Sequence, residues 1–543
     1  MTIDKAHIID ILRKFPFIIH VTDKGETEVL WMFEVLFSIG GVELPFLMHV
    51  KRDMSPMKCG DTSPLLFVNK DLLAYPHIMQ EGNLCLHTQD CVIWEDRIRV
   101  EVEAVCEWIE RYYIGGEKDE HYEDLVVNDV LINGRKVQFY YSQTNVTFHA
   151  GDYGYVAYTK ISGNSKIESS VDTYLIQGMA RHDGVQSHGE WSELYKSLTH
   201  AQGLFVILSG SPSHYGKFAM SNYAELADLC TEEQLRFVYE KLYVDKDKFT
   251  PVFWGYKTPN GKQRWLISYP DESQRIIKGQ QVRNGGKKEW FPVMEDLKMH
   301  TVDAAECSYN QFYGRGKFPE LITDKKIMVM GVGAIGSIVS TTLVRCGLKD
   351  ITLSDFDKKH PGNVCRSEYL FATGKTEKIE ELKTILESIS PYVNVTIVKE
   401  LHQVLKHAPQ SEAKIIPELL DKYDIIFDCS IDSEMMWALD QVKIKAQIVN
   451  LSISNKANEL VCAFSPGICD FVTRVYTDLI NSDAGDMYNP EGCWSPTFKA
   501  SYNDVQIMVQ YAMRYMVKML NGDMRKANFM VKEIDESLRL IRW

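Results

Sequence analysis

Residues 325–357 read KKIMVMGVGAIGSIVSTTLVRCGLKDITLSDFD, and this stretch decides the fold. The apolar run from Ile327 to Met330 predicts a short buried strand, which a tight turn joins to a helix beginning near Ala334. The turn contains three glycines, Gly331, Gly333 and Gly336. The first two let the backbone approach phosphate oxygens, and the third lets the helix pack closely on the strand. Because the first N–H groups of a helix also favour an anion, the stretch predicts a phosphate-binding turn.

A second strand is predicted from Ile351 to Leu353, and an acidic pair, Asp355 and Asp357, follows it. Asp355 follows Gly336 by 19 residues, which is the spacing at which a dinucleotide-binding fold places an acid on a ribose hydroxyl. The glycine pattern alone is weak evidence, because NAD enzymes and many other proteins share it. The nucleotide therefore has to be inferred from the residues that follow.

Polar residues after the second strand narrow the choice of nucleotide. Asn363, Arg366 and Lys378 follow the acidic pair, the last at the start of another predicted helix. A nicotinamide cofactor has no need of an arginine and a lysine converging beside its phosphates. An ATP cleaved between its α- and β-phosphates does, because negative charge builds on those oxygens. Taken singly, each cation is an ordinary surface residue; taken together, they favour phosphate binding.

Four short motifs occur in order within residues 327–432: D-x-D at Asp355 and Asp357, N-x-x-R at Asn363 and Arg366, G…K at Gly374 and Lys378, and D-C-S at residues 428–430. In this the sequence resembles the ubiquitin-activating E1 family, including its ThiF-type bacterial relatives that adenylate sulfur-carrier proteins. The resemblance implies ATP and Mg²⁺ as cofactors. It makes Asp432 the Mg²⁺ ligand. In the family this aspartate closely follows a strand, predicted here over Tyr423 to Asp428, and in this sequence one extra residue stands between the strand and Asp432. It also implies that Arg315 reaches the triphosphate, a role weighed evenly against that of a surface arginine.

The N-terminal region shows a second ordered pattern. Residues 3–15 predict an amphipathic helix, and two β-rich runs, Val29 to Phe37 and Val42 to Val50, meet near Gly40-Gly41 as a hairpin. Tyr75-Pro76-His77 precedes Cys85-Leu86, and Trp94 lies nine residues beyond the cysteine. A core-facing helix is then predicted from apolar residues stepping by four and three, namely Ile98, Val102, Val105, Ile109 and Tyr112.

This order resembles the ubiquitin-conjugating E2 family over roughly residues 1–115. The resemblance implies that Cys85 is a catalytic cysteine. The family's asparagine, which stabilises the oxyanion, is replaced here by His77, so that role is not carried over. A free cysteine taken alone is more often buried and inert, and it is the position of Cys85 in the motif that favours catalysis.

A second cysteine lies in a polar loop from Asn481 to Pro496. In E1 enzymes the catalytic cysteine often lies on a loop that crosses over the adenylate, and by that resemblance Cys493 is the first acyl acceptor. Cys365 is the runner-up, better explained as a packed neighbour of Arg366. Three further cysteines lie in apolar contexts and are predicted to be core residues: Cys346, Cys429 and Cys462.

Length and composition indicate a multidomain α/β protein. The chain has 543 residues, which favours several domains. With these resemblances, we predict an E2-like α+β domain over 1–150, a central mixed α/β domain over 151–312 and a Rossmann-like ThiF/E1 adenylation domain over 313–543. Analogy with E1 proteins implies that the central domain is a degenerate adenylation-like domain. A formal net charge of −14 argues against non-specific nucleic-acid binding. We also expect no membrane span and a cytoplasmic location.

An E2-like domain ahead of an E1-like domain resembles the bacterial E1–E2 fusion proteins of CBASS antiphage systems. The resemblance implies a cGAS-like nucleotidyltransferase as the carrier, a target lysine as the acceptor, and a homodimer formed through the adenylation domain. Three other functions stay open. They are adenylation of a sulfur carrier with a non-catalytic E2-like domain, a non-enzymatic E2-like scaffold, and an NAD(P) oxidoreductase, which the arginine and lysine disfavour.

Overall fold

The computed structural model describes residues 4–53, 55–57, 63–86, 88, 91, 93–118, 125–128, 131–161, 170–244, 250–271, 278–284, 287–293, 297–399, 401, 404–405, 415–479, 488–489 and 497–543. These form two compact units. The first comprises Met1–His188 and His200–Glu306, and the second Gly189–Thr199 and Cys307–Trp543. The chain is a mixed α/β protein with several separate sheets. Among its described helices, none combines the length and apolarity needed to cross a bilayer.

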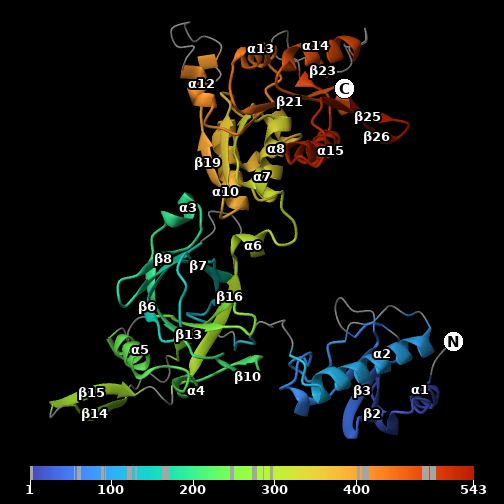
Figure 1. The fold of residues 1–543 in the computed structure, drawn as a ribbon, viewed down its shortest axis with the longest axis vertical. Coiled ribbons are helices and arrows are strands. Elements are labelled where there is room, and N and C mark those ends of the chain that lie inside the picture. Colours follow the sequence, from blue (N-terminus) through green and yellow to red (C-terminus); the bar gives the residue numbers. More distant parts are fainter. Residues whose placement is uncertain are drawn as a thin grey trace. The chain divides into compact units, whose positions relative to one another are not determined.

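The N-terminal part of the first unit is a four-stranded antiparallel meander between two helices (Figure 1). Its elements are α1 (Lys5–Leu12), β1 (Ile18–Glu26), β2 (Leu30–Ile39), β3 (Val42–Lys51), β4 (Leu65–Val68) and α2 (Trp94–Trp108). Gly40 and Gly41 both have positive φ, and Ile39 pairs with Val42 across them. The predicted hairpin is therefore confirmed, because glycine alone adopts two successive positive φ values without strain.

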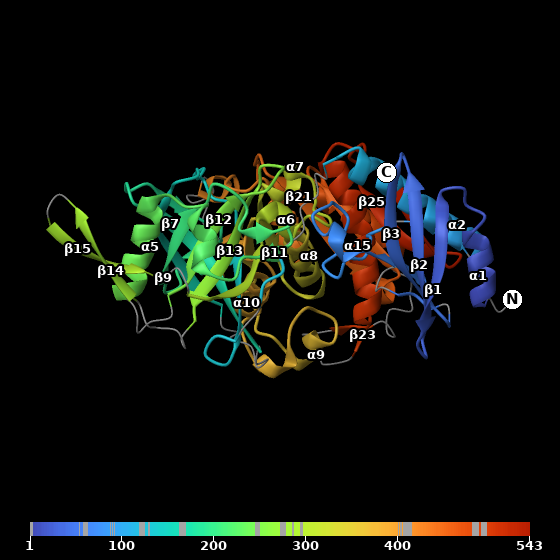
Figure 2. The same cartoon turned by 90° about the horizontal axis from the view of Figure 1, so that it is seen from below.

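One face of this meander forms an apolar core. Strands β2 and β3 bury alternate residues, which include Phe33 and Val35 of β2. Ile98, Val102 and Val105 of α2 belong to the same buried cluster. Figure 2 shows α1 and α2 beside strands β1 to β3. The predicted core face of α2 is thus confirmed, and its period of three to four residues follows from helix geometry.

The rest of the first unit is built on a closed sheet. Its strand order is β5-β16-β13-β12-β9-β6-β7-β8, and a further pairing of β5 with β7 closes seven of these strands into a ring. The strands are β5 (Lys136–Tyr141), β6 (Tyr153–Lys160), β7 (Val171–Arg181), β8 (Gln186–His188), β9 (Ala201–Ile207), β12 (Val252–Lys257), β13 (Gln263–Pro270) and β16 (Met299–Glu306). Most neighbouring strands of this barrel are antiparallel. The expected adenylation-like character of the region stays a prediction.

Aromatic side chains fill the barrel. The ring of Phe139 lies 5.1 Å from those of Tyr174 and Phe253 and 5.5 Å from that of Tyr158, measured between centroids. Burial raises the pKa of Tyr158 to about 12, so its hydroxyl stays protonated near neutral pH. Helices α4 (Tyr223–Ala227) and α5 (Glu232–Val244) pack on the outside over a second cluster. The interior is therefore a packed core and not a channel.

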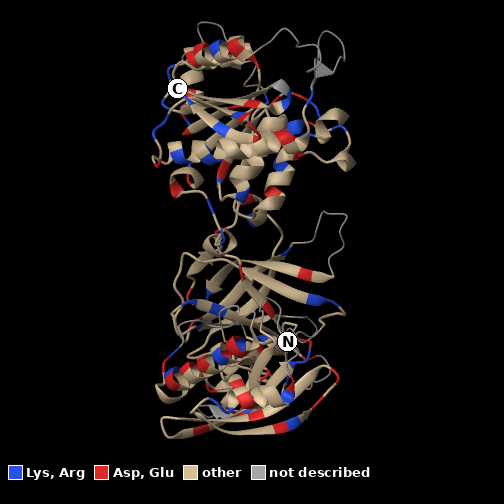
Figure 3. Cartoon of the chain, turned by 90° about the vertical axis from the view of Figure 1, so that its right-hand side faces the viewer, with Lys and Arg blue, Asp and Glu red and all other residues tan. Residues whose placement is uncertain are grey.

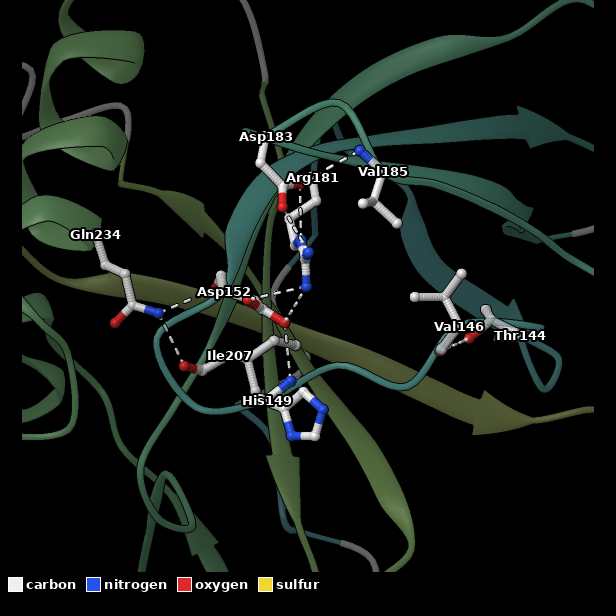
Figure 4. Close-up of polar contacts among 9 residues, drawn as sticks. All are labelled: Thr144, Val146, His149, Asp152, Arg181, Asp183, Val185, Ile207 and Gln234. Carbon is white, nitrogen blue, oxygen red and sulfur yellow. Dashed lines mark hydrogen bonds and ion pairs between the residues drawn. The ribbon is translucent and has the colours of Figure 1, made fainter.

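A polar network braces one end of the barrel (Figure 4). Arg181 binds Asp183 with two nitrogens, at 2.8 and 2.5 Å, and its Nη1 lies 3.3 Å from Asp152 Oδ2. Gln234 of α5 donates to the backbone carbonyls of Asp152, at 3.0 Å, and Ile207, at 2.9 Å. Arg181 and Ile207 end strands β7 and β9, whereas Asp152 and Asp183 lie in turns beside the strands. The network therefore ties α5 and two turns to the sheet.

The second unit contains an eight-stranded sheet, in the order β19-β18-β17-β20-β21-β22-β25-β26. The first five strands are parallel and the rest antiparallel. They are β17 (Lys326–Met330), β18 (Asp350–Ser354), β19 (Asn394–Ile397), β20 (Ile425–Asp428), β21 (Gln447–Ser454), β22 (Glu459–Phe464), β25 (Phe529–Ile534) and β26 (Ser537–Arg542). The order reverses between β17 and β20, as in doubly wound nucleotide-binding folds.

Helices cover both faces of this sheet. One face packs on α8 (Ala334–Arg345), α10 (Lys378–Ile389) and α15 (Tyr502–Leu520), and the other on α12 (Ile415–Leu420), α13 (Ser433–Gln441) and α14 (Ile468–Leu479). Within β17, Ile327 and Val329 belong to the first core, and Met328 and Met330 to the second. A strand buried on both faces reads as a continuous apolar run, which explains why the sequence predicts it.

A short segment from far upstream completes the second unit. Trp191 lies in Gly189–Thr199, is fully buried, and stacks on Tyr392 at 5.5 Å between ring centroids. Ser192 N–H donates to Pro391 O at 2.8 Å, and the Tyr195 hydroxyl of α3 (Glu193–Lys196) donates to the Glu387 carbonyl at 3.2 Å. The second unit is therefore assembled from two separate stretches of chain.

Charged residues of both signs are interspersed along the elements of the chain (Figure 3). The sequence has 60 Lys and Arg against 74 Asp and Glu. A stretch of concentrated positive charge is the usual feature of a nucleic-acid surface. The mixed pattern thus adds no argument for such a partner.

Candidate functional site

The glycine turn lies at the carboxyl end of β17, next to β20, where the strand order reverses. Gly331 has φ +75°, and a Cβ added there would lie 2.4 Å from Ser430 Cα. A Cβ on Gly336 would lie 2.0 Å from Gly331 O. Helix α8 begins at Ala334, as predicted, so Gly336 is in its first turn and allows the close packing expected of it.

The middle glycine has different surroundings. A Cβ added to Gly333 would meet no atom within 4 Å. Gly333 is also the N-cap of α8, and no side chain caps the helix there. The first N–H groups of α8 therefore face a space that is open in the described structure, beside the positive end of a helix dipole. This is the arrangement that binds a phosphate group.

These differences predict opposite effects of two alanine substitutions. Gly336→Ala should destabilise the protein by about 1–3 kcal/mol or more, because its methyl group overlaps a backbone oxygen. Gly333→Ala should leave the melting temperature nearly unchanged and weaken ATP binding by about tenfold or more, since its methyl group enters the phosphate space. Thermal unfolding and calorimetry with ATP·Mg²⁺ test both. Equal melting losses, or ATP affinity unaffected by Gly333→Ala, would contradict this assignment.

Asp355 directly follows β18 and braces the glycine turn. Its Oδ2 accepts the Val332 N–H at 2.9 Å, and its Oδ1 accepts the Asp357 N–H at 2.8 Å. Burial raises the pKa of Asp355, and nearby Lys378 opposes that rise. Each carboxylate oxygen retains a further acceptor position. Asp355 therefore holds the turn, and its contact with a ribose hydroxyl stays a prediction.

Lys378 lies close to this acidic pair. Its Nζ is 2.8 Å from Asp357 Oδ2, and its N–H donates to Asp357 O at 3.1 Å. The lysine is buried at the first position of α10. The structure thus brings Asp355, Asp357 and Lys378 together beside the turn, as the motif predicts. The ammonium is held by a partner that is itself half-exposed, and its contact with a phosphate stays a prediction.

Two of the other predicted nucleotide contacts, Asn363 and Arg366, lie in the segment before α10, and the third, Arg315, lies upstream of β17. Asn363 Oδ1 accepts the His360 N–H at 2.8 Å and closes a capping box around α9 (Pro361–Val364). Arg366 follows that helix, and its N–H donates to Asn363 O at 3.3 Å. Arg315 lies exposed between α6 (Tyr309–Phe312) and α7 (Glu320–Thr323). Contact of these three residues with a nucleotide stays a prediction.

The predicted metal ligand, Asp432, caps a helix in this structure. Its Oδ1 accepts the N–H groups of Glu434, at 3.0 Å, and Met435, at 3.1 Å, at the start of α13. Among the described residues, no group of three or more His, Cys, Asp or Glu is arranged to hold a metal ion. Mg²⁺ commonly takes one or two carboxylates together with substrate phosphates. Asp432 is a carboxylate of that kind, and its role as the Mg²⁺ ligand stays a prediction.

The buried carboxyl at this edge is Asp428, the last residue of β20. Ser430 donates to its Oδ1 through Oγ, at 2.6 Å, and N–H, at 3.1 Å. Asn450 Nδ2 donates to its Oδ2 at 2.9 Å, and within the described structure Asn450 Oδ1 has no hydrogen-bond partner. Burial, the largest effect, raises the pKa of Asp428 above the ordinary value. If the Asn450 amide is turned so that its oxygen faces Asp428, a protonated Asp428 can donate a hydrogen bond to that oxygen.

This predicts a pH dependence of stability. Because the folded pKa of Asp428 is raised, its contribution to stability falls as pH rises from the unfolded pKa through the folded one. Asp428→Asn removes that titration, so the melting temperature of the variant relative to wild type should rise between about pH 4 and about pH 7. Paired melting curves across that range are the measurement. A relative melting temperature that falls with pH would show that the ionised carboxylate is stabilising.

The candidate thioester cysteines differ from the core cysteines. Cys429 and Cys462 are buried, as predicted, and burial raises the pKa of both thiols well above the ordinary value. Cys346 is half-buried, and burial raises its pKa too. Raised pKa values make all three poor nucleophiles. Cys85 is only partly buried, whereas Cys493 lies outside the described residues.

The backbone around Cys85 is tightly ordered. The Cys85 N–H donates to His77 O at 2.8 Å, and His77 has φ 56°, an uncommon value for a residue other than glycine. The His77 ring lies 4.8 Å from that of Tyr112, between centroids. Trp108 Nε1 donates to Pro76 O at 2.9 Å. The Tyr75-Pro76-His77 motif thus positions the cysteine loop through its backbone.

A buried ion pair between Lys359 and Glu381 was not predicted from the sequence. The two side chains are each 3% exposed and lie 2.6 Å apart. Lys359 lies two residues after Asp357, and Glu381 lies three residues after Lys378. The only available signal was the i, i+3 spacing of Lys378 and Glu381, which places both on one face of α10.

Comparison with known proteins gives the class of this site. The ThiF family model matches residues 312–467, which contain the glycine turn, Asp355 and Lys378. This segment of the second unit is therefore a ThiF-type, Rossmann-like domain.

Individual relatives match part of the chain. The chain is 23% identical over 222 residues to the ATP-dependent ubiquitin transferase-like protein Cap2 of Enterobacter hormaechei, covering 39% of this chain and 36% of that protein. It is 28% identical over 123 residues to the molybdopterin-synthase adenylyltransferase of Haemophilus influenzae, covering 22% and 47%. The matches thus span less than half of these relatives.

Other matches are more limited. Ubiquitin-like modifier-activating enzyme 5 of Caenorhabditis elegans is 33% identical over 78 residues, covering 14% of this chain and 19% of that protein. Among solved structures, E. coli MccB with ATP matches 41% of this chain and 65% of that chain, at 13% identity and a TM-score of 0.30.

Proposed function

We propose that the protein is an ATP-dependent adenylating enzyme that activates the C-terminal carboxylate of a partner protein. The observation that carries this is the open space at Gly333, at the uncapped start of α8 and flanked by Asp355 and Lys378. The ThiF match over the same residues supports it. The names of the relatives, an adenylyltransferase and modifier-activating enzymes, support the same chemistry.

In this proposal ATP lies on the glycine turn, with Asp355 on the ribose. Arg366, Lys378 and Arg315 neutralise the phosphates, and Asp432 would hold Mg²⁺, which supplies further charge neutralisation. A carboxylate oxygen of the partner attacks the α-phosphorus, and the bond from that phosphorus to the bridging oxygen breaks. Pyrophosphate leaves with the bond electrons, and acyl-AMP remains. The cations act by stabilising charge that develops on the phosphate oxygens.

We propose that the acyl group then passes along two thiols. The Cys493 thiolate attacks the acyl carbonyl and AMP leaves; the Cys85 thiolate then takes the acyl group, and the Cys493 thiolate leaves. A lysine amine of the target finally attacks the second thioester, loses a proton and forms an isopeptide. The helix–meander–helix order and the backbone contact between His77 and Cys85 support an E2-like domain.

The partners and the setting are parts of the same proposal. Similarity to a ubiquitin transferase-like protein supports a protein carrier, and we propose a cGAS-like nucleotidyltransferase in a CBASS-type antiphage pathway. We also propose a cytoplasmic homodimer formed through the adenylation domain. The domain limits 1–150, 151–312 and 313–543 are proposed functional divisions.

Carrier-dependent exchange of labelled pyrophosphate into ATP tests this function. We expect exchange with the purified full chain and a carrier that has a free C-terminal carboxylate, and none with the same carrier ending in an amide. Equal exchange with the carboxylate and the amide forms of the carrier would overturn the proposal. So would a purified protein that neither binds ATP nor catalyses exchange. Adenylation of a sulfur carrier, favoured by the molybdopterin-synthase adenylyltransferase match, would give exchange that never leads to a thioester on Cys85.

A further inference from the structure

One buried ammonium holds the loop between β18 and α10. Lys359 Nζ lies 2.6 Å from Glu381 Oε2 and donates to the Leu370 carbonyl at 2.5 Å and to Thr373 Oγ1. An ammonium group has three N–H donors, and these three acceptors use all of them. The lysine is therefore fully satisfied while nearly excluded from water. We call Lys359, Leu370, Thr373, Thr376 and Glu381 the Lys359 clamp.

The carboxylate of the clamp is equally well satisfied. Glu381 Oε1 accepts the Leu370 N–H and Thr373 Oγ1, both at 2.8 Å, and Oε2 accepts Thr376 Oγ1 as well as the lysine. Burial alone raises the pKa of Glu381, but these hydrogen bonds and Lys359 outweigh it and the pKa is lowered. Glu381 is therefore ionised near neutral pH, and the clamp is an ion pair.

The clamp joins the two chain segments that carry the predicted phosphate contacts. Lys359 lies four residues before Asn363 and seven before Arg366. Glu381 lies one helical turn after Lys378 on α10. The Lys359 N–H also donates to Thr376 O at 2.8 Å, so the ends of the loop are joined through the backbone. The position of Arg366 relative to Lys378 thus depends on contacts made inside the loop.

We propose that Lys359 and Glu381 are positioning residues that fix Arg366 relative to Lys378. Arg366 and Lys378 can then both reach the β- and γ-phosphates of ATP; this inference rests on the proposed function. Neither clamp side chain touches the nucleotide. A buried charge tolerates few arrangements, because losing any partner leaves it unpaired away from water. Misplacing a charge-stabilising group by about 1 Å costs about 10²-fold in rate. The clamp therefore supplies a rigid geometry.

The ratio of the affinity for ATP to the affinity for AMP distinguishes a positioning role of the Lys359 clamp from a role in protein stability alone. AMP needs only the glycine turn and Asp355, whereas ATP also needs the two cations. Lys359→Met leaves Glu381 unpaired and should lower the melting temperature. Lys359→Met with Glu381→Gln removes both charges and should recover much of that loss. The matched control removes a neighbouring pair on α10, Lys383→Met with Glu387→Gln, whose charged atoms lie 3.8 Å apart and more exposed.

Calorimetry with ATP·Mg²⁺ and with AMP on the full chain gives the answer. We expect the clamp double variant to bind ATP at least about tenfold more weakly and AMP within about twofold of wild type, with the control unchanged. An unchanged ratio in the clamp double variant would overturn the inference and leave the proposed function standing. If the affinities for ATP and AMP fall equally, together with the melting temperature, the inference is also overturned and the clamp has a structural role. Failure of wild type to bind ATP would instead overturn the proposed function.

Discussion

Arg366→Ala and Lys378→Ala should each slow carrier-dependent pyrophosphate exchange by about 10²-fold or more, with little change in melting temperature. Both side chains are proposed to neutralise charge that develops on the phosphate oxygens as the α–β bond breaks. The direct partner of Lys378 is half-exposed Asp357, which stays accessible to solvent when the lysine is removed. Exchange rates with saturating ATP, measured beside thermal unfolding, provide the comparison.

Lys375→Ala is a matched control for this prediction. Lys375 is an exposed cation in the same loop, three residues before Lys378. Its removal changes the net charge by the same amount, so it should leave the exchange rate within about twofold of wild type. A large drop in melting temperature with only a proportionate loss of exchange would assign Arg366 and Lys378 a structural role. An equal loss in Lys375→Ala would point to a general charge effect.

Cys85→Ala should stop transfer to lysine completely while acyl-AMP formation continues. If Cys493 loads first, the carrier should then accumulate on Cys493 as a band that reductant removes. Cys85→Ser should hold the carrier as an oxyester that resists mild thiol treatment, because an alkoxide leaves less readily than a thiolate. Cys493→Ala should make acyl-AMP and form no thioester on either cysteine. Gel analysis with and without reductant distinguishes these species.

Cys106 provides the control for cysteine loss in the same domain. It lies on α2, and burial raises the pKa of its thiol to about 12. Such a thiol is almost wholly protonated near neutral pH, so Cys106→Ala should transfer normally. Charging of Cys85 in Cys493→Ala would mean direct transfer from the adenylate. Normal lysine conjugation by Cys85→Ala would leave the N-terminal region as a binding module.

Local patterns predicted the elements that carry the site. The run Ile327–Met330, the helix start at Ala334 and the hairpin at Gly40-Gly41 are all present as expected. Each depends on residues close in sequence: a strand buried on both faces, a glycine turn, and paired positive φ values. The grouping of Asp355 with Lys378 was also predictable, because the helix that follows a parallel strand begins on the side of the sheet where that strand ends.

Features that depend on distant contacts were not predicted. The closure of the barrel requires β5 to pair with both β16 and β7, and no local pattern encodes that register. The Lys359–Glu381 pair was missed because charged residues are usually exposed, and only the folded loop shows that both are buried. The helix-capping role of Asp432 depends on where α13 begins, one residue after it.

The Gly189–Thr199 segment constrains how this protein arose by recombination. A single crossover near residue 306 would deliver the ThiF-type sequence without Trp191, leaving Tyr392 without its stacking partner. The recipient would inherit an incomplete core and expose a large apolar surface. An exchange that preserves the unit must therefore carry the upstream segment along. Lineages should accordingly inherit the Gly189–Thr199 segment and the ThiF-type region together.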